Sequence, residues 1–338
     1  MKIAFVISEV YAVCKYNGVR VQAQTWADEL MKKGHDIILV NPWDTQSWKE
    51  YDIVHIFGPV QFIRSFVNIL KAENSNQVIV YSPIIDTNQA IWKYKLISYA
   101  GCDRLRLSTH QYNVRKAKTF INHWFVRSQY ELLYVNKAYD VPVENISVVP
   151  LSFRIPTIDY YPEKDNFCLH VSTLCEERKN VMRLIDAAIK YNFRLVLAGS
   201  ITEDEFVPFK MKIEANKNIE YLGRISDEEL IELYKRAKVF ALPSLYEGVG
   251  MVAVEAAAYG DDIVITQLGG PKEYYGDKSL VVDPYSVDDI GNAILKALDS
   301  KERQPALMNY VINNFNISHC VDLLLQSYGM TLQEYIDC

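Results

Sequence analysis

SLYEGVGMVAVEAAAYG, residues 244–260, is a glycine-rich turn that leads directly into an alanine-rich helix. Glycine has no Cβ, so Gly248 and Gly250 allow the backbone amides of the turn to approach a ligand closely. The stretch from Met251 to Tyr259 predicts a helix, whose first amides lack internal partners and whose N-terminus carries partial positive charge. The segment is therefore suited to binding an anion such as a diphosphate.

Two glutamates, Glu247 and Glu255, flank the start of this helix with seven residues between them. Their charges repel a diphosphate, but carboxylates accept hydrogen bonds from hydroxyl groups. We therefore expect Glu247 to bind a sugar hydroxyl and Glu255 to bind a ribose. Glutamates beside a turn are usually solvated, but Glu255 lies among valines and alanines, where a charge generally has a function or a partner.

Two further segments continue the pattern. Downstream, residues 261–284 predict a short strand, a Gly269-Gly270-Pro271 turn, and a second apolar strand. Upstream, residues 168–190 predict a strand, a charged loop that contains Arg178 and Lys179, and a helix. An isolated basic pair is usually solvated, but this one lies between a strand and a helix, ahead of the two glutamates. We therefore expect Arg178 and Lys179 to bind phosphate.

In this order, the segments resemble the C-terminal domain of retaining glycosyltransferases of family four. That domain carries a Glu-Gly-Phe-Gly turn, two glutamates separated by seven residues, an alanine-rich helix that ends in glycine, and a Gly-Gly-x-Pro-Glu loop. The first half is similar as well, because Gly18, Gly34 and His35 match a glycine loop and a Gly-His helix end. The resemblance implies a GT-B fold, in which two doubly wound, Rossmann-like α/β domains face each other across a cleft.

The resemblance also implies the site residues. The catalytic positions fall on Glu247, Lys179 and Arg178. The donor-binding positions fall on Gly18, Thr173, Glu247, Gly248, Val249, Gly250, Met251, Val252, Glu255, Gly269 and Gly270. The departures from the family pattern are Val249 for an aromatic residue, Val252 for a proline, Thr173 for a phosphate-binding arginine, Asn17 for a glycine, and Pro271, which comes one position early. Arg178 is expected to substitute for the missing arginine.

One family feature is missing from the first half. Family members usually offer a histidine to the donor sugar after the fourth strand, where this chain has Ser82 and Pro83. Asp86 is the nearest polar residue, although an aspartate at a helix start is more often a cap. For His55, which lies in a predicted strand, a core role is favoured. Two further histidines, His110 and His123, are not assigned to either surface or site.

Strand-like and helix-like segments alternate in two series, which predicts two parallel sheets covered by helices. The strands are expected near residues 3–7, 36–40, 52–56, 78–81, 123–126 and 146–149, and near 168–172, 194–198, 219–222, 239–242, 263–266 and 280–282. The first domain is expected to span residues 1–155 and to bind the acceptor, and the second to span 156–316 and to bind the donor. The resemblance implies that a last helix, about 317–338, crosses back to the first domain.

The resemblance implies transfer with retention and without a protein nucleophile. Positive charge from Lys179, Arg178 and the helix N-terminus at Gly250 and Met251 would stabilise the departing nucleoside diphosphate. A donor phosphate oxygen would then take the acceptor proton. The chain has no Asp-x-Asp pair and no ligand cluster with convincing metal spacing, so neither a metal nor a cofactor is expected.

Charge is distributed unevenly along the chain. Residues 1–155 contain 18 Lys and Arg against 13 Asp and Glu, whereas the remainder contains 18 against 29. Seven cations interleaved with aromatic residues form a candidate acceptor or membrane face: Lys93, Lys95, Arg104, Arg106, Arg115, Lys116 and Lys118. Such a face suits an anionic membrane surface or a lipid-diphosphate acceptor. A solvated helix face with its aromatic side chains in the core explains the same pattern. The net charge of −6 and the lack of a motif argue against nucleic acid.

These observations predict a glycosyltransferase of the hexosyltransferase type, acting in the synthesis of surface polysaccharide, lipopolysaccharide or glycolipid. Its partners would be a nucleotide-sugar donor and a glycan or lipid-linked acceptor. Two alternatives stay open, namely a GT-B nucleotide-sugar epimerase and a nucleotide-sugar binding protein without transfer activity. The six scattered cysteines and the lack of a long apolar run predict a cytoplasmic protein, with possible peripheral contact to the membrane.

Overall fold

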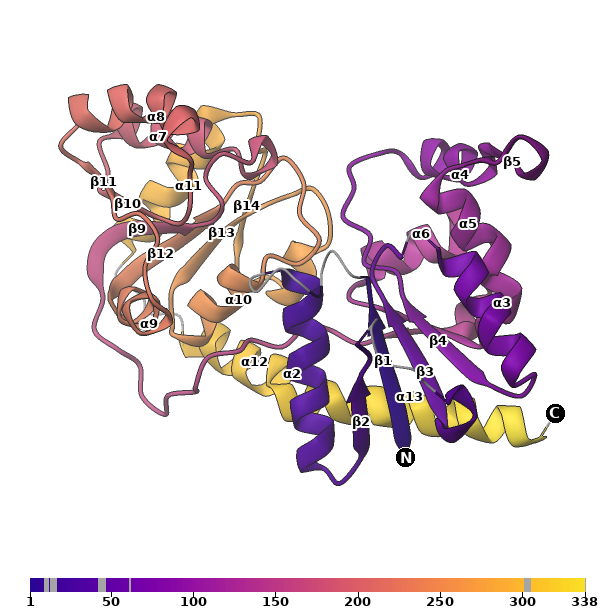
Figure 1. The fold of residues 1–338 in the computed structure, drawn as a ribbon. Helices are drawn as coiled ribbons and strands as arrows, with labels where there is room; N and C mark the ends of the chain where they lie inside the picture. Colours follow the sequence, from indigo (N-terminus) through magenta and orange to yellow (C-terminus); the bar gives the residue numbers. More distant parts are fainter. Residues whose placement is uncertain (9–11, 13–16, 42–46, 61, 301–304, 338) are drawn as a thin grey trace. The chain divides into compact units, whose positions relative to one another are not determined.

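The computed structural model describes residues 1–338 except 9–11, 13–16, 42–46, 61, 301–304 and 338, and it divides into two compact units (Figure 1). Unit 1 comprises Met1–Ile85, Gln89–Leu151 and Ile317–Cys338. Unit 2 comprises Asp86–Asn88 and Ser152–Asn316. The chain therefore enters unit 2 slightly before the expected position 155, and its last helix belongs to unit 1.

Unit 1 contains a six-stranded parallel sheet. Its strands, in spatial order, are β2 (Asp36–Leu39), β1 (Lys2–Ile7), β3 (Ile53–Phe57), β4 (Val78–Ser82), β7 (His123–Val126) and β8 (Ile146–Val148). Its helices are α2 (Gly18–Lys32), α3 (Ile63–Glu73), α4 (Ile91–Tyr99), α5 (His110–Ala117), α6 (Gln129–Tyr139) and α13 (Ile317–Asp337). Strands β3 and β4 are buried at every position, as continuous apolar runs in the middle of a parallel sheet should be.

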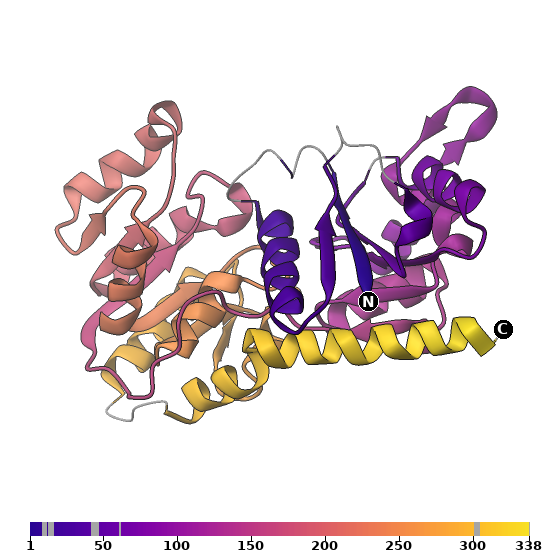
Figure 2. The ribbon, with the colours of Figure 1, turned by 60° about the horizontal axis from the view of Figure 1, so that its bottom comes forward.

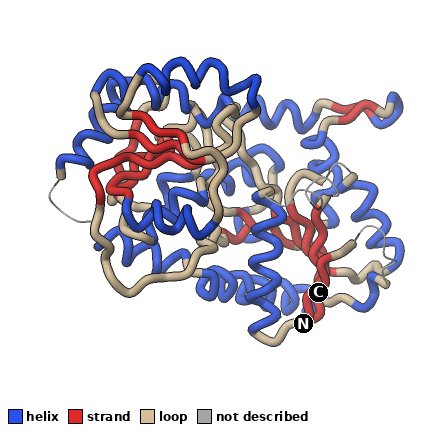
Figure 3. Tube along the Cα trace, turned by 60° about the vertical axis from the view of Figure 1, so that its left-hand side comes forward, coloured by secondary structure: helices blue, strands red, loops and turns tan. Residues whose placement is uncertain are grey.

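Unit 2 contains a second six-stranded parallel sheet. Its spatial order is β11 (Ile219–Tyr221), β10 (Leu195–Ala198), β9 (Asp165–Val171), β12 (Ala237–Leu242), β13 (Asp262–Thr266) and β14 (Leu280–Val282). Its helices are α7 (Val181–Tyr191), α8 (Glu203–Ala215), α9 (Asp227–Arg236), α10 (Met251–Ala258), α11 (Val287–Asp299) and α12 (Pro305–Phe315). All twelve expected strands are present, and in each unit the strands lie between helices (Figure 3). The prediction of two doubly wound α/β domains is confirmed.

Several short elements were not predicted. A two-stranded hairpin, β5 (Gly101–Cys102) and β6 (Leu107–Ser108), projects from unit 1 (Figure 2). Single 3₁₀ turns occur at Trp48–Glu50, Asp103–Leu105, Lys118–Phe120, Val143–Asn145, Glu177–Lys179 and Pro271–Tyr274. Elements this short carry no periodicity from which the sequence could reveal them. No helix in the described part of the chain combines the length and apolar character that a bilayer crossing needs.

His55 is a core residue, as expected. Its ring is fully buried in β3, with Nδ1 2.5 Å from the Tyr328 hydroxyl and Nε2 2.8 Å from Ser82 Oγ. Burial lowers its pKa well below the ordinary value. The histidine thus joins two strands of the sheet to the last helix through neutral hydrogen bonds.

His123 should make the stability of the protein depend on pH. Burial lowers the pKa of His123 from 6.5 to about 4. Between these two pH values the unfolded chain binds a proton at His123 that the folded chain does not bind. His123 therefore lowers the free energy of unfolding by about 2 kcal/mol when the pH falls from 7.5 to 5. In His123→Gln, an amide that does not titrate takes the place of the Nε2 that lies 2.8 Å from Ser147 Oγ. We therefore expect the free energy of unfolding of His123→Gln, relative to that of the wild type, to rise by about 2 kcal/mol between pH 7.5 and pH 5.

Urea denaturation of both proteins at the two pH values measures this difference. Asp261 and Asp262, whose pKa values burial raises to about 7 and about 6, titrate in the same range. They are common to both proteins, so their contribution cancels in the comparison. A constant difference between the two proteins at pH 7.5 and pH 5 would show that His123 is not the group responsible.

Candidate donor site

The order of the unit 2 sheet places two distant loops together. Strands β9 and β12 are neighbours, with Cys168 beside Val239 and Leu169 beside Phe240. They lie where the strand order reverses, which is where parallel α/β sheets bind ligands at the carboxyl ends of their strands. The loop after β9 carries Arg178 and Lys179, and the loop after β12 carries Glu247. A backbone hydrogen bond of 2.7 Å, from the amide of Leu245 to the carbonyl of Arg178, joins the two loops.

The two predicted phosphate-binding cations both contact Glu247. Lys179 Nζ lies 2.5 Å from Oε2, and Arg178 Nη1 lies 3.1 Å from Oε1. Glu247 is 7% exposed, and its Oε2 also accepts from Ser244 Oγ at 3.4 Å. Arg178 makes a second ion pair, of 2.8 Å, with Glu176. A diphosphate bound here would compete with the Glu247 carboxylate for Lys179, a relation that the sequence alone did not indicate.

Helix α10 begins beside this cluster, with Gly250 at its N-cap. Gly250 has φ 74°, in the left-handed region that favours glycine, and a Cβ there would lie 2.7 Å from Leu242 Cδ2. No side chain caps the helix, so its first amides are not bound by a capping group. Gly248 and Val249 are buried in the turn, and Met251 and Val252 are half-buried. The helix start therefore retains the anion-binding character that the sequence predicts.

Gly269 packs against the same turn. It forms an isolated parallel bridge with Glu247, and a Cβ at this position would lie 2.1 Å from the Glu247 carbonyl oxygen. With φ 91°, the position strongly favours glycine. Gly270 follows as the N-cap of the 3₁₀ turn Pro271–Tyr274. The Gly269-Gly270 turn thus fixes the backbone that carries Glu247, and its contact with a donor stays a prediction.

Glu255 has a partner that the sequence did not reveal. Its carboxylate is completely buried and accepts from Arg154 Nε at 2.8 Å and from the Tyr234 hydroxyl at 3.3 Å. The apolar neighbours of Glu255 indicated that a partner was needed, but Arg154 lies 101 residues earlier and no local pattern connects them. Binding of a ribose by Glu255 stays a prediction, and it would use a carboxylate already oriented by Arg154.

Two predicted donor-binding residues, Gly18 and Thr173, lie outside the cluster around Glu247 in the described contacts. Gly18 was interpreted as a loop residue, and that is wrong because it is the first residue of helix α2. Asn17 caps this helix by accepting from the amide of Val19 at 2.9 Å, and nothing lies within 4 Å of a Cβ built at Gly18. Thr173 is exposed at the start of the loop after β9. Neither residue touches the Glu247 cluster in the described contacts, so their role in donor binding stays a prediction.

The chain after β4 departs from regular geometry where the family histidine was sought. Ile84, a β-branched residue, has φ 53°, which is a strained conformation of the kind found at functional sites. Asp86 follows and groups with unit 2, and it does not cap helix α4, whose N-cap is Ala90 without a side-chain bond. Burial lowers the pKa of Arg178, but the charges of Glu247, Glu176 and Asp86 raise it above its ordinary value. Asp86 is thus electrostatically coupled to the cation pair.

The candidate acceptor or membrane face is only partly free. Lys95 and Arg115 pair with Asp140 at 2.5 and 2.7 Å, and Lys118 Nζ donates to the Tyr139 carbonyl at 2.7 Å. These three cations lie at the C-terminus of α6, where positive charge is favourable, and their place in an acceptor or membrane face stays a prediction. Lys93, Arg104, Arg106 and Lys116 are exposed. The aromatic side chains divide in the same way: Tyr94 and Tyr112 are buried, whereas Trp92 and Tyr99 are exposed together with Leu96, Leu105 and Leu107.

Metal-ligating residues do not gather in the described parts of the chain. No three His, Cys, Asp or Glu side chains there lie close enough together to hold an ion. No disulfide bond joins the four described cysteines, Cys102, Cys168, Cys175 and Cys320. The expectation that the reaction needs no metal therefore stays a proposal about chemistry.

Comparison with known proteins identifies relatives of the second half of the chain. The family model for glycosyl transferases group 1 matches residues 158–314, which cover nearly all of unit 2. The O-antigen chain mannosyltransferase B of Escherichia coli is 30% identical over 175 residues, which are 48% of this chain and 46% of that protein. The chain spans about half or less of the length of the curated relatives it matches.

Solved structures match over both units. HepE of Anabaena, in complex with UDP, has a TM-score of 0.73 at 14% identity and covers 98% of this chain and 100% of its own. Sucrose-phosphate synthase from Thermosynechococcus elongatus has a TM-score of 0.71 at 15% identity, with coverage of 99% and 100%. At these identities the likeness concerns the fold, and the predicted GT-B class is confirmed.

Proposed function

Because residues 158–314 belong to glycosyl transferases group 1, we propose that this protein moves a hexose from a nucleoside-diphosphate sugar to a glycan or lipid-linked acceptor, with retention at the anomeric carbon. The observation that carries the proposal is the cluster of Lys179, Arg178 and Glu247 beside the uncapped start of α10. Two cations and a helix N-terminus at one sheet edge form a site for a diphosphate. The O-antigen mannosyltransferase among the relatives supports a role in surface polysaccharide synthesis.

The exchange of partners at Lys179 gives each residue a role. When a donor binds, its diphosphate takes Lys179 and Arg178 from Glu247, because two phosphates carry more charge than one carboxylate. Glu247 is then free to accept a hydrogen bond from a hydroxyl of the sugar. As the bond from the anomeric carbon to the phosphate oxygen breaks, Lys179, Arg178 and the α10 amides stabilise the charge on the leaving diphosphate. A phosphate oxygen takes the acceptor proton, and no protein nucleophile is needed.

The first test is binding of nucleoside diphosphates. In a thermal-shift screen of UDP, GDP and ADP, we expect one to raise the melting temperature, since a ligand of the folded state stabilises it. Glu247→Ala should retain or strengthen this shift, because Lys179 loses its competitor for the phosphates. The same variant should lose most of the additional effect of the attached sugar. A variant with reduced binding of the free nucleoside diphosphate would contradict the proposed exchange.

Turnover separates transfer from the alternatives. Release of free nucleoside diphosphate that depends on an acceptor supports the transferase. Interconversion of the sugar supports an epimerase, and binding without turnover supports a binding protein. Since the cations and the helix start supply the positive charge, activity is expected to persist in EDTA.

We further propose that the acceptor side of the protein contacts an anionic membrane at the cytoplasmic surface. Trp92, Leu96 and Tyr99 recur at helical spacing on α4 and are 61%, 61% and 54% exposed. The β5–β6 hairpin adds Leu105 and Leu107 beside two arginines. Apolar and cationic side chains on one exposed surface suit the interface of an anionic bilayer. If this contact forms, phosphatidylglycerol vesicles should slow the alkylation of the exposed thiol of Cys102, which lies in the same hairpin.

A further inference from the structure

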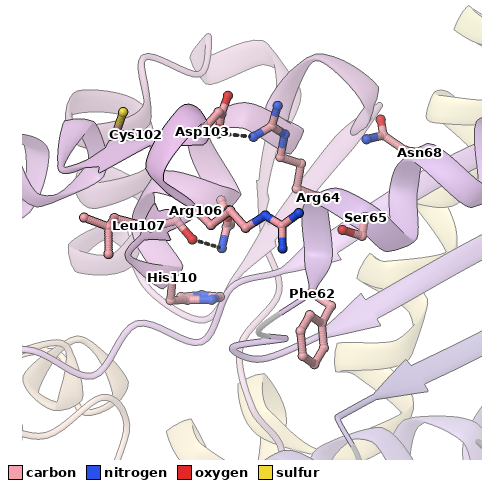
Figure 4. A pocket seen from close by; sticks show the side chains of 11 residues that line it. Phe62, Arg64, Ser65, Asn68, Cys102, Asp103, Arg106, Leu107 and His110 are labelled. Atoms are coloured by element: carbon pink, nitrogen blue, oxygen red, sulfur yellow. Dashed lines mark hydrogen bonds and ion pairs between the residues drawn. The ribbon is translucent and has the colours of Figure 1, made fainter.

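Unit 1 contains a cavity of about 710 Å³ between helix α3, the β5–β6 hairpin and helix α5 (Figure 4). Its volume lies within the range of sites for small molecules. Arg64 of α3, Arg106 of the hairpin and His110 of α5 all line it. The cavity is thus built by three elements, and the hairpin that closes it is one that the sequence did not predict.

The charged side chains in this cavity leave an excess of positive charge. Arg64 pairs with Asp103 at 2.6 Å, and Asp103 is the one acid among the described residues that line the cavity. Arg106 extends across the cavity above His110 in Figure 4 and forms no ion pair with the described residues. Arg106 also has φ 54°, a left-handed conformation that is uncommon for a residue with a side chain. A strained backbone therefore presents an unpaired guanidinium to the cavity.

His110 adds an unsatisfied polar atom. Its Nδ1 is buried and has no hydrogen-bond partner in the described structure. Burial lowers the pKa of His110, and an interaction with the Val60 backbone opposes that shift. A buried polar atom without a partner is rare and calls for an explanation. Asn113 and Ser108, whose side chains hydrogen-bond at 3.2 Å, supply further polar groups along the same wall.

We infer that this cavity binds the phosphate group of an organic phosphate of about sugar size. The planar guanidinium of Arg106 matches a phosphate in two parallel hydrogen bonds, and Arg64 adds a second positive charge. A protonated phosphate oxygen donates to His110 Nδ1, or the ring takes up a proton and donates to the phosphate. A neutral sugar satisfies none of these charges. The identification of this ligand as part of the acceptor rests on the proposed function, whereas the phosphate site itself does not.

Cys102 provides a direct readout, because it lines the cavity and is an exposed free thiol. We would measure the rate at which iodoacetamide alkylates Cys102 in the whole protein, by mass spectrometry of its peptide. Saturating glucose 1-phosphate is expected to slow the reaction at least threefold, and equimolar glucose to leave it unchanged. Vesicles containing phosphatidylglycerol form a parallel arm, which distinguishes a lipid headgroup from a soluble phosphate.

Two variants locate the effect. Arg106→Gln removes the unpaired charge and should abolish protection, while the alkylation rate without ligand serves as its own reference. Lys179→Ala disables the cation pair of unit 2 and should leave protection at Cys102 intact, so failure of the donor site and failure of this site are separable. Protection by glucose 1-phosphate that is lost in Arg106→Gln supports the inference, whereas protection by the vesicles alone assigns the effect to the membrane contact and overturns it. The inference is also overturned by equal protection from glucose, by no protection in either arm, or by protection that survives Arg106→Gln.

Discussion

Replacing Lys179 with alanine should lower kcat/KM for transfer about 10²- to 10³-fold, which is the usual effect of removing one group that stabilises developing charge. Lys179 Nζ is the cation closest to Glu247, and its side chain is only 12% exposed. Water therefore screens this charge poorly, and among the described residues Lys179 is the one lysine that pairs with Glu247. Arg178 also pairs with Glu176 and is more exposed than Lys179, so Arg178→Ala should lower kcat/KM less than Lys179→Ala does.

The measurement is initial rates of nucleoside diphosphate release at varied donor concentration. Lys190→Ala is a matched control, because Lys190 is a lysine of the same unit whose side chain is 56% exposed and whose pair with Asp288 lies at the surface. That substitution should leave kcat/KM within about twofold, since exposed ion pairs contribute little. If Lys179→Ala retained more than a tenth of the wild-type kcat/KM, the donor diphosphate would have to bind elsewhere.

Periodicity and composition predicted the sheets because their strands are largely apolar runs of three to seven residues between turns. The order of the strands in unit 2, which the structure supplies, explains why the loop of Lys179 meets that of Glu247. The β5–β6 hairpin was missed because strands of two residues have no pattern. Gly18 was misplaced because glycine indicates a loop, whereas here Asn17 supplies the helix cap.

The site was predictable where its residues lie in one segment and less so where the fold joins distant segments. Glu247, Gly250 and the start of α10 are contiguous, so their geometry follows from local rules. The ion pair between Lys179 and Glu247 required the sheet order, and the pair between Arg154 and Glu255 required the packing of a proline-rich connection against α10. Side-chain pairing across about a hundred residues has no signature in a single sequence.

Substituting Arg154 should lower the free energy of unfolding more than substituting its ion-pair partner Glu255. Arg154→Met leaves a fully buried carboxylate whose remaining partner among the described residues is the Tyr234 hydroxyl. Removing one member of a buried ion pair typically costs about 3–5 kcal/mol. Glu255→Gln leaves the guanidinium instead, but Arg154 is 33% exposed and water solvates it in part. We expect this second substitution to cost about 1–2 kcal/mol, and the double variant to be more stable than Arg154→Met alone.

Urea denaturation of the wild type, the two single variants and the double variant measures their free energies of unfolding. Nucleotide binding then shows whether Glu255 has a role in ligand binding besides its structural one. If Glu255 binds the ribose, the wild type should prefer a nucleoside diphosphate over its 2′-deoxy form about tenfold, the effect of one charge-assisted hydrogen bond. Glu255→Gln should reduce that preference while still binding both forms, which a loss of stability alone would not produce. Because the comparison is a ratio within each protein, it is independent of the stability of the variant. A preference that persists unchanged in Glu255→Gln would leave the carboxylate with a structural role, as the partner of Arg154, and would assign the ribose to another group.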